Sequence, residues 1–350
     1  MTGVFVTGIG MYTALGEDRP STCAALRSGI AALALTKRFP LLGPDPEWDP
    51  PEPIRAARLP TLPVDLPAPE RLRRMSIAAI GEAMRAAGIQ RVDLPNTAVL
   101  VALPSEGHAV ASWRLDDFAH EIVREAGLSA VGLVEQRANG HAGVVELLHR
   151  AAEIAVDRRA RRRVVVLGVD TYLARERVRE LDAAGRLASE RSPEGFSAGE
   201  GAVALVIDGA RTEKAPLARL TAFGFGHEAD AYASERAPSG RGMEAAILAA
   251  CSGLPEDAKI AWMLSDLNGE PWRAMEWGAA VSRLGPRVDD ELELQHPADA
   301  LGDVGCATGA LLVAAAADAL AEGYAPADIA FVSTAADAGA RAVVRVEAAN

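Results

Sequence analysis

The chain alternates between short apolar runs and longer stretches in which apolar residues recur at helical spacing. Four short runs predict buried strands: Val4–Ile9, Ala98–Ala102, Val164–Val169 and Ala202–Ile207. Three longer stretches predict helices: Met75–Ala87, Gly140–Ala155 and Tyr172–Ala183. Strands that alternate with helices favour a mostly parallel sheet covered by helices on both faces, so the pattern predicts an α/β fold.

The second part of the chain repeats the opening of the first part. Leu220–Gly226 is an apolar run that ends in Gly-x-Gly, as Phe5–Gly10 does, and the polar segment Gly209–Pro216 precedes it. Later runs predict the strands Lys259–Ser265, Glu291–Leu294, Ile329–Ser333 and Ala342–Val346, and the helices Met243–Cys251 and Ala307–Ala321. We therefore predict an internal duplication, with one half at residues 1–212 and the other at 213–350.

Two segments interrupt this pattern. Residues 40–69 contain ten of the 21 prolines, and because proline lacks an N–H donor we expect a long surface loop there. A docking arm for a partner is the alternative interpretation. Arg158–Arg163 contains five arginines, which we interpret as a solvated helix end, with a docking site for an acidic partner as the alternative.

Composition and charge narrow the class of protein. A length of 350 residues fits two packed domains, and a net charge of −12 argues against nucleic acid and anionic membranes as partners. The three cysteines form neither a disulfide framework nor a zinc motif. We find no signal peptide and no apolar stretch of about 20 residues, so we expect a cytoplasmic protein without a membrane span.

Three glycine-containing segments carry a family resemblance. They are Val4–Gly10 (VFVTGIG), Gly195–Ala202 (GFSAGEGA) and Gly302–Gly309 (GDVGCATG), and in order and spacing they resemble the β-ketoacyl synthases of the thiolase superfamily. The resemblance implies a thiolase-like fold of two duplicated βα halves in αβαβα layers. It also implies a two-fold dimer, formed with a second copy or with a ketosynthase-like chain.

The catalytic residues of that family are absent from the matching positions. Where the family has one cysteine and two histidines, this chain has Asn139, Asp266 and Asp303. An amide is not a nucleophile for thioesters, and an ionised carboxylate accepts hydrogen bonds and repels a thioester oxyanion. Two neighbouring carboxylates could instead share a proton or hold a hard cation. Alignment on the glycine would place Asn268 at the first histidine position.

Each candidate site residue also has a structural interpretation. Asn139 precedes an apolar helix, where its side-chain oxygen is expected to cap the first turn; the alternative is a hydrogen bond to a ligand carbonyl. His141 is interpreted as a packed histidine or as a recruited base. The resemblance places Phe196 near the acyl pocket. The candidate ligand-binding residues are therefore Asn139, His141, Phe196, Asp266 and Asp303.

Cys306 is the rival nucleophile. It opens an apolar helix, where the helix dipole would favour a thiolate, but a buried cysteine also serves as a small apolar filler. We favour the filler, because only about forty residues follow Cys306, too few for the family's remaining half.

We therefore expect a catalytically degenerate β-ketoacyl synthase-like protein that acts as a binding or scaffold partner. Dimer partner, binder of an acyl chain or of an acyl carrier protein, and bacterial accessory protein for secretion effectors are the forms considered. The alternative is an acyltransferase or thioester hydrolase that uses Cys306, or Asp266 with Asp303. No cofactor and no metal are predicted.

Overall fold

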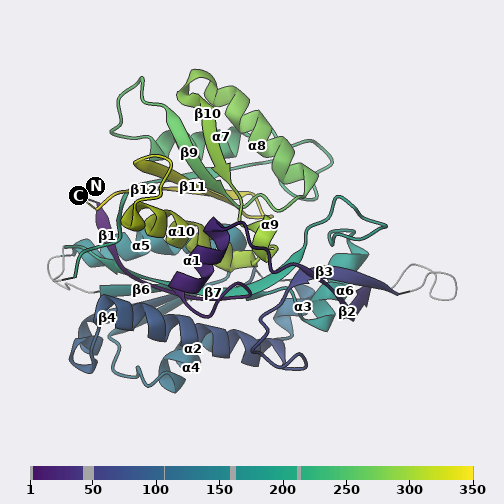
Figure 1. Cartoon of the computed structure of the whole chain (residues 1–350), viewed down its shortest axis with the longest axis horizontal. Helices are drawn as coiled ribbons and strands as arrows, with labels where there is room; N and C mark the ends of the chain where they lie inside the picture. The colour runs from purple at the N-terminus through teal and green to yellow at the C-terminus, as the bar shows by residue number, and fades with distance from the viewer. Residues whose placement is uncertain (1–2, 42–50, 106, 158–162, 211–213, 350) are drawn as a thin grey trace.

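The structure is a computed structural model that describes residues 3–41, 51–105, 107–157, 163–210 and 214–349. Figure 1 shows two sheets with helices between them and on both outer faces. The first sheet contains β1 (Val4–Thr13), β4 (Thr97–Ala102), β5 (Leu133–Arg137), β6 (Arg163–Thr171) and β7 (Ala198–Asp208). The second contains β8 (Ala218–His227), β9 (Ile260–Ser265), β10 (Val288–Gln295), β11 (Ile329–Ala335) and β12 (Ala340–Glu347).

Both sheets have the same strand order. The first runs β5-β4-β6-β7-β1 and the second β10-β9-β11-β12-β8. In each, three neighbouring strands are parallel and the following strand is antiparallel to its neighbours. A short antiparallel pairing between β1 and β8 joins them. The predicted α/β duplication is therefore visible as a repeated topology, while the boundary at 212/213 stays a prediction.

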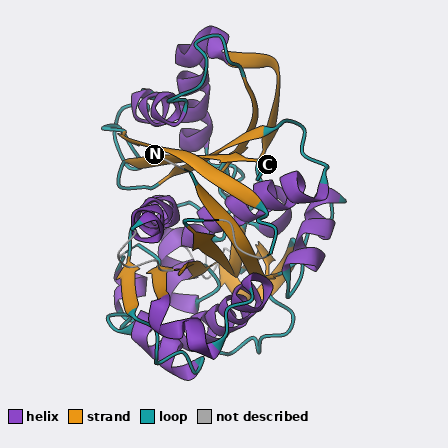
Figure 2. Cartoon of the chain, turned by 90° about the vertical axis from the view of Figure 1, so that its left-hand side faces the viewer, coloured by secondary structure: helices purple, strands orange, loops and turns teal. Residues whose placement is uncertain are grey.

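The helices complete a five-layer arrangement, which Figure 2 shows from the side. The outer helices on the first sheet are α2 (Ala68–Ala87) and α4 (Phe118–Glu125), and those on the second are α7 (Arg241–Ala250) and α8 (Pro271–Leu284). The central layer consists of α5 (Gly143–Val156) and α10 (Thr308–Glu322), which contact strands of both sheets. The predicted αβαβα order is confirmed.

The remaining elements are short. They are α1 (Arg19–Arg27), α3 (His108–Ala111), α6 (Arg175–Ala183) and α9 (Ala298–Leu301), the strands β2 (Ala34–Leu41) and β3 (Glu52–Ala57), and the 3-10 turns η1 (Arg91–Asn96), η2 (Gly140–Ala142), η3 (Gly285–Arg287) and η4 (Gly305–Ala307).

The two Gly-x-Gly motifs allow the same close helix-on-strand contact in the two halves. A Cβ built on Gly10 would lie 2.0 Å from the carbonyl oxygen of Ala79 in α2, and one on Gly224 would lie 1.8 Å from that of Ala246 in α7. Both strands therefore need glycine because the backbone of an outer helix lies directly against them. The sequence repeat reflects a repeated helix-on-strand contact.

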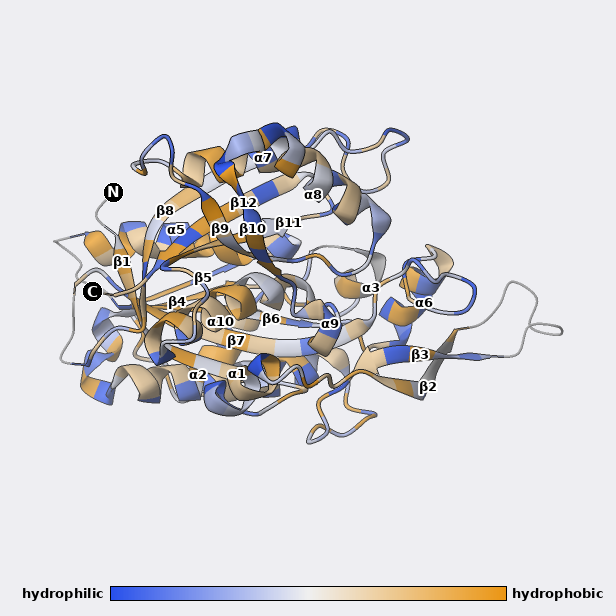
Figure 3. Cartoon of the chain, turned by 45° about the horizontal axis from the view of Figure 1, so that its top comes forward, coloured by the Kyte–Doolittle hydropathy of each residue, from blue (hydrophilic) through white to orange (hydrophobic). Residues whose placement is uncertain are grey.

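The central layer is the most apolar part of the molecule, as the hydropathy colouring in Figure 3 indicates. Gly305–Glu322, which includes α10, is long and apolar enough to cross a membrane, although no such stretch was expected. However, 78% of this window is buried inside the fold. Its apolar character is explained by contacts with both sheets, as for the core helix of a layered protein.

Two sequence predictions need correction. The proline-rich segment is not a continuous loop, because β3 lies within it and pairs with β2 and β7. In β3 the side chains of Ile54 and Ala56 are buried and that of Arg55 is exposed, an alternation that suits a strand. Residues 42–50 of that segment, like most of the arginine run, lie outside the described residues. The helix predicted from Tyr172 begins only at Arg175, because the backbone of the preceding residue, Ala174, is extended.

Candidate functional site

Two equivalent turns meet between the sheets. After β5, Gly140 opens η2 and leads into α5, while Gly305 opens η4 and leads into α10. Gly140 has φ +55° and Gly305 has φ +57°, both in the left-handed region that favours glycine. The duplication therefore extends to the turns that carry the candidate residues, and η2 and η4 lie against each other.

Asn139 does not cap the following helix, so that expectation is wrong. Its side chain is exposed, accepts no hydrogen bond from the first turn, and instead donates from Nδ2 to Glu146 in α5. If the family match were moved by one residue, the nucleophile position would hold Gly140, which supplies no side chain at all.

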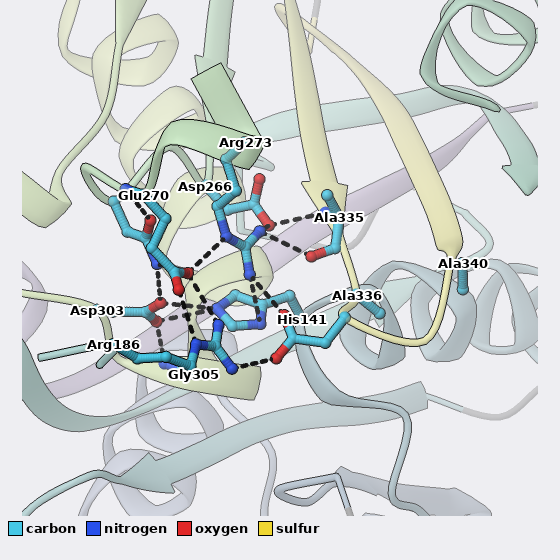
Figure 4. Close-up of polar contacts among 12 residues, drawn as sticks. His141, Arg186, Asp266, Glu270, Arg273, Asp303, Gly305, Ala335, Ala336 and Ala340 are labelled. Atoms are coloured by element: carbon cyan, nitrogen blue, oxygen red, sulfur yellow. Dashed lines mark hydrogen bonds and ion pairs between the residues drawn. The ribbon is translucent and has the colours of Figure 1, made fainter. Parts of the chain in front are cut away.

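His141 is buried between a carboxylate and a guanidinium (Figure 4). Its Nε2 lies 2.9 Å and 3.1 Å from the two carboxylate oxygens of Asp303, and its Nδ1 lies 3.4 Å from Arg273. Because the guanidinium only donates, the network assigns the proton of the neutral ring to Nε2. Burial lowers the pKa of His141, but the charge of Asp303, its hydrogen bond and the charge of Asp266 together leave that pKa above its ordinary value.

Asp303 is saturated with hydrogen bonds. Besides His141, the amide of Asn268 donates to it at 2.7 Å, and the backbone N–H of Gly305 donates at 2.7 Å. Burial raises the pKa of this carboxyl, but His141 and Asn268 outweigh that effect and hold it well below the usual range. Asp303 is therefore a fixed anion rather than a proton donor.

Asp266 is held in the same way by different groups. Arg273 of α8 donates to it at 2.8 Å, and the backbone N–H of Ala335 donates at 2.7 Å. Each carboxylate thus has its own partner, Arg273 at Asp266 and His141 at Asp303, and this geometry does not support the shared-proton hypothesis. Within the described residues no cluster of three or more His, Cys, Asp or Glu side chains could hold a metal ion.

A second arginine, Arg186, extends the charged network from the first sheet to the second. Arg186 lies between α6 and β7, and its guanidinium pairs with Glu270 at 2.7 Å and with Asp337 at 2.6 Å. Glu270 also accepts from Asn268, which connects it to Asp303 (Figure 4). The result is one buried group of alternating charges at the contact between the first and second sheets.

Cys306 is a packed thiol. Its side chain is fully buried, and Sγ lies 3.0 Å from the carbonyl oxygen of Val169 and 3.4 Å from that of Ala102. Burial and the nearby Asp170 carboxylate raise the pKa of this thiol well above its ordinary value. This environment is the reverse of the electropositive surroundings that activate a cysteine, so the geometry favours the filler interpretation.

A pocket of about 550 Å³ opens beside this network. Asn139 and His141 line it, together with Tyr172, Arg177 and Arg186. Of the other candidate ligand-binding residues, Asp266 and Asp303 border only small voids of about 10 Å³. Phe196 is 1% exposed and packs behind the pocket wall, with its ring 4.9 Å from that of Tyr172. The structure therefore brings two of the five candidates to the pocket.

Sequence reasoning missed the arginines. Arg177 pairs with Asp170 and its guanidinium lies 3.9 Å from the Tyr172 ring, and Arg186 lies 4.0 Å from the Tyr232 ring. A polar signal existed, because Asp170 lies near the end of the buried strand β6 and Asp266 directly follows the buried strand β9. No pattern along the chain, however, pairs Arg186 with residues 84 and 151 positions away.

Comparison with known proteins identifies the fold. No protein-family model matches the chain, and no curated protein matches it in sequence. Solved structures do match. The ishigamide ketosynthase/chain length factor superposes with a TM-score of 0.80 at 18% identity, over 100% of both chains.

Two complexes give similar values. A chain from the complex of a type II polyketide synthase acyl-carrier protein with its ketosynthase bound to the hexaketide has a TM-score of 0.78 at 15% identity, over 100% of both chains. The ketosynthase in complex with its chain length factor from Xenorhabdus doucetiae has a TM-score of 0.77 at 14% identity, over 99% of this chain and 98% of that one. The chain therefore has the thiolase-like fold of ketosynthases and chain length factors.

Proposed function

We propose that this protein is a catalytically silent ketosynthase-like chain that works as the dimer partner of a second chain of the same fold, in the bacterial cytoplasm. The observation that carries the proposal is the state of Asp266 and Asp303. Both are buried carboxylates, held by Arg273 and by His141 respectively, so neither provides the neutral imidazole that carbon–carbon bond formation in this fold needs. The turn before α5 contains no thiol.

The buried network explains how the fold tolerates this loss. A lone buried carboxylate would be costly, but Arg273, His141 and Asn268 supply charge and hydrogen bonds at both positions. Both carboxylates therefore have their hydrogen-bond partners without a ligand. Ion pairs of the chain itself fill the place of the former reaction centre. We therefore expect the surface of the chain to carry its function.

One face of the molecule suits a partner chain. Within the described residues β5 pairs only with β4, so one edge of the first sheet is free to bond another strand. An aromatic patch on a neighbouring part of the same side contains Phe223, Phe225 and His149, with ring distances of 5.2 Å and 5.4 Å from the histidine. Phe225 is 42% exposed. Arg150, next to His149 on α5, pairs with Glu135 on β5 and connects the patch to the edge.

The assembly test uses the full chain in size-exclusion chromatography with light scattering. We expect a dimer, formed alone or with a co-expressed ketosynthase from the same gene neighbourhood. Phe225→Lys should produce a monomer, because it places a charge in the aromatic patch. Leu248→Lys is the matched control, since Leu248 is also 42% exposed but lies on α7. The proposed interface would be contradicted by a monomer both alone and with the co-expressed ketosynthase. It would also be contradicted by a dimer that survives Phe225→Lys.

The chemical test is separate. Purified protein is incubated with acyl and malonyl thioesters of a carrier protein, and intact mass is recorded. We expect no condensation product and no acyl adduct on the chain. Turnover that is lost on changing Asp303 or Cys306 would instead establish the enzyme alternative.

A further inference from the structure

A second cavity lies away from the network described above, at the opposite end of the central helix layer. Its volume is about 520 Å³, within the range of small-molecule pockets. Its walls come from α1, from the end of β10, and from α10 with the turn after it. It shares no lining residue with the pocket beside His141.

The floor of this cavity is apolar. Cys23, Leu264 and Ala319 are nearly fully buried, and Leu294 and Ala315 are partly exposed to the cavity. The backbone N–H of Ala32 bonds to the carbonyl of Ala300 at 2.8 Å, which fixes the chain after α1 against α9 and closes one side. Burial raises the pKa of the Cys23 thiol to about 12, so the floor carries no charge near neutral pH.

The mouth of the cavity carries one arginine without a carboxylate partner. The guanidinium of Arg27 lies over the ring of Tyr324, 4.7 Å from its centroid, and among the described residues no acid pairs with it. The nearby acids already have partners: Asp318 pairs with Arg19 at 2.7 Å, and Asp299 with His296 at 3.0 Å. The cation at the rim is therefore available to a ligand.

The carbonyl groups at the end of α1 already accept hydrogen bonds, so they do not compete with the Arg27 guanidinium for a ligand at the mouth of the cavity. Gly29, with φ +68°, donates its N–H to Leu26, and Ile30 donates to Ala25. These bonds occupy the last carbonyls of the helix, so the rim presents the guanidinium. An apolar floor below a free cation matches a ligand with an apolar body and one negative end.

We propose that this cavity binds a small amphipathic carboxylate, with the apolar body against Leu264, Leu294 and Ala315 and the carboxylate at Arg27. A guanidinium recognises a carboxylate through two parallel hydrogen bonds, and the ring of Tyr324 holds the guanidinium in place. This site is independent of the proposed partner function, because neither Phe225 nor the charged network contributes to it.

The test titrates octanoate, octanol and octylamine separately into the full chain by isothermal titration calorimetry. We expect octanoate to bind at one site per chain and the other two to bind at least tenfold more weakly. Arg27→Ala should weaken octanoate binding about tenfold, the effect of losing one charge-assisted contact. The control Arg55→Ala removes an exposed arginine on β3 and should change nothing.

Two blocking variants locate the binding site. Ala315→Phe fills the cavity, and Ala31→Trp obstructs the mouth at an exposed position, which keeps the test valid if the first variant fails to fold. Both should abolish binding. Ala138→Trp, placed in the pocket beside His141, should preserve it. No binding of octanoate, equal binding of octanol, unchanged affinity in Arg27→Ala, or loss of binding only in Ala138→Trp would overturn the proposal.

Discussion

At the scale of single residues, the molecule shows how a buried position is adapted to a change of charge. Asp303 stands where the family resemblance expects a histidine, and the surrounding groups supply three donors to it. Asp266 has a guanidinium and a backbone N–H. Both sites are electrostatically complete, so a substitution at either residue should act on stability before it acts on chemistry.

Cys306 should resist alkylation in the folded protein. Its Sγ donates to backbone carbonyls and lies close to Asp170, so the thiolate is strongly disfavoured at neutral pH. Mass spectrometry after iodoacetamide treatment should show negligible labelling in buffer and complete labelling in denaturant. Cys251, which is 6% exposed, provides an internal comparison. Rapid, saturable labelling of Cys306 in the native state would revive the nucleophile hypothesis.

The His141–Asp303 pair should make stability depend on pH in a defined direction. The pKa of His141 is raised by folding, so its contribution is present below its unfolded pKa of about 6.5 and is lost as pH rises through the folded value. The pKa of Asp303 is lowered, so its contribution is present above about pH 4 and is lost in acid. The His141–Asp303 pair therefore stabilises the folded protein most between about pH 4 and 6.5.

His141→Gln tests this dependence. The other charged groups that face the ring are Arg273, Asp266 and Asp337, which are ion-paired with one another. Urea midpoints measured between pH 6 and 8.5 should fall with pH in the natural protein and fall less in the variant. His120→Gln is the control, because its side chain is 61% exposed. Equal slopes in the natural protein and in His141→Gln would contradict the assignment.

At the scale of elements, the glycines of β1 and β8 decide how closely the outer helices approach. Gly224→Ala would place a Cβ 1.8 Å from the carbonyl oxygen of Ala246, and backbone cannot move aside as a side chain can. We expect a loss of about 3 kcal/mol in the free energy of unfolding, at the upper end for overpacking.

The control for this prediction lies in α8. Gly278 is exposed and has no neighbouring atom within 4 Å of a built Cβ. Gly278→Ala should therefore stabilise the protein by about 0.5 to 1 kcal/mol through helix propensity. Urea denaturation of both variants measures the difference, and a destabilised Gly278→Ala together with an unaffected Gly224→Ala would refute the contact argument.

At the scale of the whole molecule, ion pairs connect the two sheets in addition to the apolar contacts. Arg186 belongs to the first part of the chain, and its partners Glu270 and Asp337 to the second. Glu270 is 4% exposed, and its other cation, Arg273, lies farther away at 3.6 Å, so Arg186→Ala removes the nearer cation of a buried charge and should lower the free energy of unfolding by about 3 kcal/mol.

Arg191→Ala is the matched control for that substitution. Arg191 pairs with Glu52 at 3.0 Å, but its side chain is 29% exposed, so water compensates for the loss. We expect the free energy of unfolding to fall by about 0.5 kcal/mol. Chemical denaturation gives both values, and similar losses in the two variants would show that the Arg186 network adds little to the contact between the sheets.

The sequence alone determined the α/β class, the duplication and most strands, because each depends on apolar periodicity or on glycines that repeat along the chain. That Asp266 and Asp303 replace imidazoles stays a prediction of the family resemblance. Sequence reasoning failed for β3, where prolines conceal a two-residue alternation, and for Asn139, whose side chain bonds to the Glu146 side chain instead of capping the helix.

Only the tertiary structure decided what the candidate residues contact. The pairing of His141 with Asp303, of Arg273 with Asp266 and of Arg186 with Glu270 spans 162, 7 and 84 residues of chain. Local patterns constrain neighbours within a few residues, whereas ion pairs depend on which elements the sheets bring together. For the same reason the cavity at Arg27, built from three distant segments, has no signature along the chain.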